Sequence, residues 1–293
     1  MLLVRSLGVA TAGMWRFLLV VPFLLALILL LTIIIGSRSW FFAAIFFASS
    51  ANLAMLVAMR TAFAQIGEYS APDLMKLIFG GVKYWFLHAV VTLILFAAAG
   101  MIVKIADVHG MTGLGAEIRQ SGLAPTFDSL MTDPFFAAMI WGESILSGLF
   151  WTALLVPQAA VAWSSAQNRE PFDLFWGFGA RFLALLPVVL LTFGVIFVTG
   201  AADAAYRFVV YAFMATFALL LSVDLDPLTR SEITEMAVGC GIVVLAAYWQ
   251  AVAAALAFVD RRDEAERARA AAYVTTAEDK VDAAALRRMR QQG

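Results

Sequence analysis

Long apolar runs alternate with short polar segments along most of this chain. Because lipid offers no hydrogen-bond partner to the backbone, runs of this kind cross a membrane as helices. The first run has no charged residue and about twenty residues, enough to cross a hydrocarbon core of about 30 Å. Strands of a membrane β-barrel are about ten residues long and alternate in polarity. The pattern predicts an all-α, polytopic membrane protein with six to seven transmembrane helices, at residues 17–36, 40–59, 84–103, 135–163, 182–202, 208–223 and 236–259.

Two segments, 72–83 and 171–181, resemble each other in sequence and each precedes an apolar run. Each has a Pro near its start and apolar residues at i, i+3, i+4 and i+7, which is typical of an amphipathic helix. We therefore expect two interfacial amphipathic helices, each bending into a transmembrane helix. The likeness continues into the following runs, so residues 40–103 and 135–202 are a candidate parallel repeat. The alternative is chance similarity between apolar segments.

The chain divides into a transmembrane bundle, residues 1–259, and a charged tail, residues 260–293. The tail has opposite charges four residues apart, such as Arg262 with Glu266, which favours a helical, soluble segment. Thr276 and Asp279 resemble a capping box, so a last helix is expected to begin at Ala277.

Composition agrees with this division and narrows the functional class. Apolar residues make up 63% of the chain and charged residues 14%, against about 45–50% and about 25% in soluble domains. The net charge of −1 argues against a nucleic-acid-binding protein. Cys240 is the one cysteine, which excludes a disulfide framework and a cysteine zinc site. The Ala-rich, Lys-poor composition is typical of a multi-pass protein of the bacterial inner (cytoplasmic) membrane.

Basic residues predict which ends of the helices face the cytoplasm, because Lys and Arg accumulate there. If the two interfacial segments lie on the cytoplasmic side, four basic residues lie outside, namely Arg38, Lys104, Arg119 and Arg207. Eight basic residues then lie inside, namely Arg5, Arg16, Arg60, Lys76, Lys83, Arg169, Arg181 and Arg230. Seven crossings would then put the basic tail outside, so we expect that one late segment, such as 208–223, does not cross fully. The inverted orientation is the alternative.

Glu143 is the sharpest candidate for chemistry, since it lies about 12 Å into the fourth apolar run. A carboxylate at that depth is costly and normally faces protein or water. Lys104 and Arg207 come from the same half of the membrane and are its candidate partners. The group is either a proton relay, ion relay or gate, or a structural charge pair or neutral carboxyl that fixes helix packing.

Other polar and small residues within the apolar runs can be interpreted as structural or as functional. His88 either titrates near neutral pH or donates an interhelical hydrogen bond, and Asn52 and Gln250 are expected to bridge helices. Small residues at helical spacing form packing faces within the bundle or a dimer interface; these are Ala138, Gly142, Ser144 and Gly148, and separately Ala247, Ala251 and Ala255. Basic and Trp residues are expected as interfacial anchors, namely Lys76, Lys83, Arg169, Arg181, Trp85 and Trp176.

No catalytic signature occurs in the sequence, neither a phosphate-binding loop, nor a nucleophile elbow, nor an HExxH zinc motif. We therefore expect a non-enzymatic integral membrane subunit, scaffold or channel-forming component of a larger assembly or secretion complex, with no cofactor and no metal. Its expected partners are the bilayer, other membrane subunits or a second copy, and a cytoplasmic protein that binds the tail, but no nucleic acid. The alternative function is a secondary transporter or permease with Glu143 as the ion-coupling or gating residue.

Overall fold

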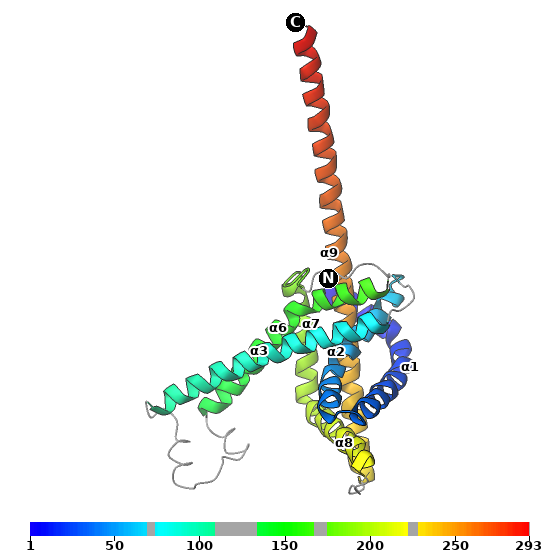
Figure 1. The fold of residues 1–293 in the computed structure, drawn as a ribbon, viewed down its shortest axis with the longest axis vertical. Coiled ribbons are helices and arrows are strands. Elements are labelled where there is room, and N and C mark those ends of the chain that lie inside the picture. Colours follow the sequence, from blue (N-terminus) through cyan, green and yellow to red (C-terminus); the bar gives the residue numbers. More distant parts are fainter. Residues whose placement is uncertain (69–73, 109–133, 167–174, 222–227, 293) are drawn as a thin grey trace.

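A computed structural model describes residues 1–68, 74–108, 134–166, 175–221 and 228–292 of the chain. Within these ranges the protein is helical and contains no strand, which confirms the all-α prediction. The helices are α1 (Leu2–Gly36), α2 (Trp40–Gln65), α3 (Leu74–Val108), α6 (Pro134–Ala166), α7 (Phe182–Val198), α8 (Ala201–Leu221) and α9 (Arg230–Gln292). Figure 1 shows a bundle of helices from which the last part of α9 projects.

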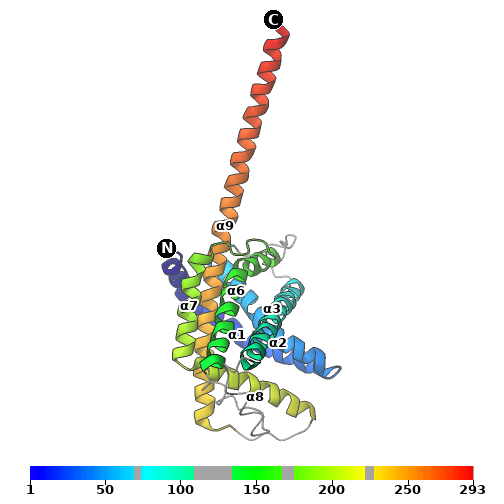
Figure 2. The ribbon, with the colours of Figure 1, turned by 90° about the vertical axis from the view of Figure 1, so that its left-hand side faces the viewer.

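The first half of α9 forms the axis of the bundle. Every residue from Ala251 to Phe258 is at most 1% exposed, as expected for a helix that is apolar on all sides. Helices α1, α2, α6, α7 and α8 all contact α9, and two perpendicular views show them around it (Figures 1 and 2). Five of these eight residues are Ala, and small side chains allow helices to approach closely. Ala251 and Ala255, predicted from spacing as a packing face, are therefore buried in the core.

Aromatic rings pack around Phe258, near the point where α9 leaves the bundle. The rings of Phe63 from α2, Trp163 from α6 and Trp176 before α7 lie with their centroids 5.6, 5.5 and 5.4 Å from that of Phe258. Tilted and edge-on contacts at this distance add to the energy of apolar burial. Phe258 therefore joins three elements that are distant in the sequence.

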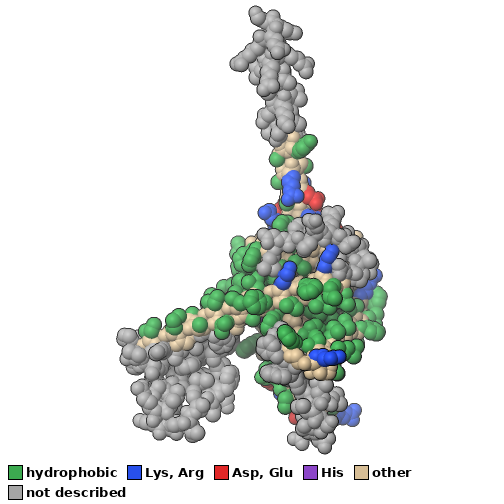
Figure 3. Space-filling model, in the orientation of Figure 1, with side chains coloured by type: hydrophobic (Ala, Val, Ile, Leu, Met, Phe, Trp, Pro, Cys, Tyr) green, Lys and Arg blue, Asp and Glu red, His purple; other side chains and the backbone are tan. Residues whose placement is uncertain are grey.

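The outer halves of α3 and α6 leave the bundle together as an arm (Figure 1). The described side chains on this arm are largely apolar and exposed, among them Leu93, Met101, Ile105 and Ile145. Figure 3 shows the hydrophobic side chains continuing from the bundle along the arm. Exposed apolar surface of this extent suits a lipid environment.

Four helical stretches among the described residues are long and apolar enough to cross a membrane, namely Leu2–Gly36, Leu74–Ile102, Ile145–Ser164 and Arg230–Tyr273. The broken pair Phe182–Val198 and Ala201–Ala212 brings the number to five if it counts as one span, and it bends by 76°. The bend is at Gly200, whose φ of +67° is readily adopted only by glycine. The predicted sixth span, 208–223, thus lies largely in a helix that turns away from α7. The count of six to seven spans stays a prediction.

The two interfacial segments take different conformations. Residues 74–83 are the first turns of an uninterrupted α3, and Leu77 is buried there. Among the described residues of the second segment, 175–181 form turns, with positive φ at Gly177, Gly179 and Arg181. Apolar residues at i, i+3 and i+4 occur both in an interfacial helix and in the first turns of a helix that packs on a core. The spacing therefore cannot distinguish these two structures. The parallel repeat stays a prediction.

The tail is helical, but it is not a separate helix. α9 runs without interruption from Arg230 to Gln292, so no helix begins at Ala277 as the sequence suggested. The Ala-rich segment before Thr276 favours helix. α9 therefore continues through Thr276 and Asp279, which lie in its interior and not at a helix start.

Candidate functional site

Charged residues surround α9 at the point where it leaves the bundle. Three charged positions of α9, all within five residues, each form an ion pair with a different element. The pairs are Asp260 with Arg5 of α1, Arg262 with Glu68 after α2, and Glu264 with Arg181 before α7. We call these six residues the exit cluster. Figure 3 shows blue and red side chains gathered at this level of the molecule.

The pair between Glu68 and Arg262 is the most enclosed part of the exit cluster. Arg262 Nη1 and Nη2 donate to the two Glu68 carboxylate oxygens over 3.0 and 2.9 Å, and the two side chains are only 17% and 27% exposed. Trp163 Nε1 donates to Glu68 Oε2 over 3.0 Å, and the Arg262 guanidinium lies 5.2 Å from the centre of the Trp163 ring. Two-pronged pairs are the strong kind of charged hydrogen bond. The Glu68 hydrogen bonds raise the pKa of Arg262 above its ordinary value.

A second charged cluster lies at the other end of the buried part of α9. Arg207 of α8 contacts Asp203 one turn earlier at 2.8 Å and Glu235 of α9 at 2.5 Å. The sequence suggested Glu143 as the partner of Arg207, whereas the described structure pairs it with these two carboxylates. The side chains of Glu143 and Lys104 lie outside the described part of the structure.

A capping box begins α9 beside this cluster. The Thr229 backbone N–H and hydroxyl donate to Glu232 Oε2 over 2.8 and 2.6 Å, and the Glu232 N–H donates to Thr229 Oγ1 over 3.3 Å. These bonds lower the pKa of Glu232 below its ordinary value. The sequence carries the signal for this cap as Thr-x-x-Glu at 229–232, the pattern that defines a capping box.

The two charged clusters are separated by the uncharged residues 236–259 of α9. Glu235 and Asp260 are about 37 Å apart along the helix, slightly more than the hydrocarbon thickness of about 30 Å. The spacing matches one membrane crossing with a charged belt at each interface. Arg230 therefore lies at the end opposite to Arg262, about 48 Å away, and not with the basic residues of the interfacial segments, where the sequence had placed it.

Gln250 connects three helices inside the bundle, as its position in an apolar run predicted. Its amide nitrogen donates to Thr192 Oγ1 of α7 over 2.5 Å, and its oxygen accepts from Trp151 Nε1 of α6 over 3.4 Å. For Asn52 no hydrogen bond to another helix is found among the described residues, and its buried Oδ1 atom has no partner there. His88 of α3 meets the Trp151 ring edge-on at 5.9 Å, which places it at the α3–α6 contact.

The remaining predicted residues fall into separate places. At Gly142 and Gly148 of α6 an added Cβ would meet no described atom within 4 Å, so this part of the predicted packing face makes no close contact within the described chain. The side chains of Ala138, Ser144 and Arg169 lie outside the described residues. Of the predicted anchors, Lys83 is exposed, Lys76 and Trp85 are half-buried, Trp176 packs on Phe258, and Arg181 belongs to the exit cluster.

Known proteins and metal chemistry give no further guide to function. No family model, curated protein or solved structure matches this chain. Over the ranges that the structure describes, no three His, Cys, Asp or Glu side chains are grouped so that they could hold a metal ion.

Proposed function

We propose that this protein is a non-enzymatic integral membrane subunit of a larger complex, of the assembly or secretion type. The observation that carries the proposal is the double role of α9. One helix forms the buried axis of the bundle and then extends about 42 Å beyond Glu264 (Figure 1). A helix built in this way links the membrane bundle to something outside it.

The described side chains on the projecting part of α9, residues 266–273, lack the packing that normally stabilises a helix. Residues 266–273 are all exposed, and Tyr273 is 80% exposed. Helices in proteins gain most of their stability from tertiary packing rather than from intrinsic propensity. A long exposed helix that carries an aromatic side chain is therefore best explained by a partner protein that packs against it.

The exit cluster supports a coupling role for α9. Asp260, Arg262 and Glu264 attach the helix to α1, to the end of α2 and to the segment before α7, just below the projecting part. A sideways force on the projecting part would act on all three elements together. This arrangement is more typical of a helix that holds a partner in position than of a loosely tethered tail.

We further propose that the exit cluster faces the cytoplasm of a bacterial cell, with the protein in the inner membrane. Residues 260–293 contain eight Lys and Arg, and Arg5 and Arg181 lie at the same end. The described basic residues away from this end include Arg38 between α1 and α2, Arg207 and Arg230. This asymmetry follows the preference of basic residues for the cytoplasmic side. It also fits α7 and α8 as a bent pair that adds one crossing rather than two.

Affinity purification of the full chain in mild detergent tests the proposed function. We expect one or more proteins to co-purify in fixed stoichiometry. A variant with Ala270, Ala271 and Ala272 all changed to Gly keeps the length of the chain but weakens the projecting helix, since each Gly costs about 1 kcal/mol. It should lose the partners. The bundle itself should stay folded, so the variant should elute in gel filtration at the volume of the unaltered chain stripped of its partners. A single monodisperse species from the unaltered chain would overturn the proposal.

A further inference from the structure

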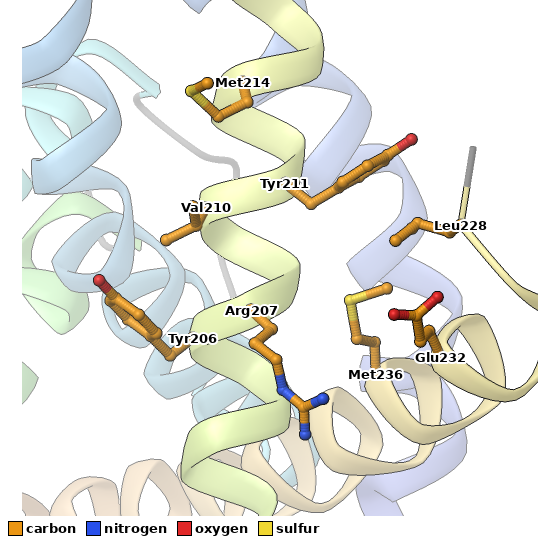
Figure 4. A pocket seen from close by; sticks show the side chains of 8 residues that line it. All are labelled: Tyr206, Arg207, Val210, Tyr211, Met214, Leu228, Glu232 and Met236. Carbon is orange, nitrogen blue, oxygen red and sulfur yellow. The ribbon is translucent and has the colours of Figure 1, made fainter. Parts of the chain in front are cut away.

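An open groove of about 410 Å³ lies between α8 and the first turns of α9. Figure 4 shows Arg207 and Tyr211 on α8, with Leu228, Glu232 and Met236 on the other side. The walls are mainly apolar, with Met214, Leu228 and Met236 among them. Its volume falls within the range of about 300–1,000 Å³ that is usual for small-ligand sites.

The charges at this groove suit a zwitterionic headgroup, since Arg207 and Glu232 both line it. The Arg207 guanidinium contacts Asp203 and Glu235 through Nη2 alone, so its other N–H groups can bind the phosphate of a headgroup. Glu232 adds a third carboxylate at the wall. One guanidinium and three carboxylates leave a net charge of −2 at this place. The aromatic faces of Tyr206 and Tyr211 are further surfaces that attract an ammonium group.

The groove lies at the depth of lipid headgroups. Glu232 is about 42 Å from Asp260 along α9, which equals the thickness of a bilayer with its headgroup layers, about 40–45 Å. Two Tyr residues line the groove, and Tyr is enriched at this interface. The bend of 76° between α7 and α8 turns α8 away from the direction of the crossing, so the groove is bounded by an interfacial helix.

We propose that this groove binds an aminophospholipid of the surrounding leaflet. The primary ammonium of an ethanolamine headgroup lies against Glu232 and Tyr211. The first part of an acyl chain lies against Met214, Leu228 and Met236. An anionic phospholipid without an amine, such as phosphatidylglycerol, is disfavoured here by the net negative charge.

Lipid retention by the purified full chain tests this site. The protein is placed in nanodiscs with equal amounts of phosphatidylethanolamine and phosphatidylglycerol, released into detergent, and analysed by native mass spectrometry for bound lipid. The variant is Glu232→Gln, because Gln also satisfies the capping box and so keeps the start of α9. The control is Glu266→Gln, which removes the same charge from an exposed position of the same helix.

We expect the unaltered chain and Glu266→Gln to retain phosphatidylethanolamine in excess over phosphatidylglycerol. Glu232→Gln should lower this excess about threefold, the effect of one partly exposed ion pair. Equal retention of the two lipids by the unaltered chain would overturn the proposal. An unchanged excess in Glu232→Gln would overturn it as well, because the preference would then come from other lipid-facing surface.

Discussion

The Glu68 carboxylate and the Arg262 guanidinium, 194 residues apart in the chain, form a two-pronged ion pair where α9 leaves the bundle. Trp163 completes the contact, since its indole N–H binds Glu68 and its ring lies beside the guanidinium. The pair thus joins α2, α6 and α9 at a single point. Its position between the membrane bundle and the projecting helix makes it the first contact to test.

Glu68→Gln should lower the free energy of unfolding by about 2 kcal/mol, because the largely covered Arg262 guanidinium then keeps only Asp263 as a charged acceptor. Thermal unfolding of the purified protein in detergent, followed by circular dichroism, measures the change. Glu266→Gln removes an equivalent charge from an exposed position and should have little effect.

Arg262→Lys separates charge from geometry at the same pair. Lys keeps the positive charge but cannot form the two-pronged contact or lie flat beside the Trp163 ring. It should therefore destabilise the protein, though less than Glu68→Gln. Equal melting temperatures for Glu68→Gln and Glu266→Gln would contradict the importance assigned to this pair.

The helices could be predicted from sequence because each apolar run has the length of a membrane crossing. The interaction of Gln250 followed from the same reasoning, since a buried amide needs partners. The exit cluster could not be predicted, because nothing local links Glu68 to Arg262. Arg207 is a different case, because its partner Asp203 lies four residues earlier, a spacing at which opposite charges pair on a helix. The bend at Gly200 depends on a backbone conformation that spacing does not encode.

Gly13→Ala should destabilise the contact between α1 and α9. A Cβ at this position would lie 2.3 Å from the Tyr248 hydroxyl oxygen. Tyr248 is 0% exposed and its ring stacks on Phe17 at 4.6 Å, so the hydroxyl has little room to move. Overpacking of this kind costs about 1–3 kcal/mol, measurable as a lower melting temperature in detergent.

Two matched variants check this explanation. Gly8→Ala lies in the same helix with no described atom within 4 Å of the new Cβ, so it should be neutral or slightly stabilising. Tyr248→Phe removes the clashing oxygen and should restore most of the stability lost in Gly13→Ala. A loss that persists in the double variant would show that the contact is not the cause.

Gly239→Ala should weaken the contact between α8 and α9. Its Cβ would lie 2.4 Å from the Cβ of Ala204, an atom that can move only if the backbone moves. The expected cost is again about 1–3 kcal/mol, with reduced protection of α8 from hydrogen exchange. Gly241→Ala, which has no described atom within 4 Å, is the control and should leave α8 protected. Equal exchange in the two variants would show that Gly239 does not set the separation of α8 and α9.

Glu143→Gln distinguishes the proposed subunit from a transporter. A coupling or gating carboxylate acts through its charge or its proton, and Gln has a similar shape but neither property. If the protein acts through α9, Glu143→Gln should express normally, keep its co-purifying partners and support the same cellular phenotype as the unaltered chain. The triple Gly variant of residues 270–272 should lose all of these except expression. The reverse pattern, in which Glu143→Gln alone abolishes the phenotype while the weakened α9 is tolerated, would favour ion-coupled transport over the coupling of a partner through α9.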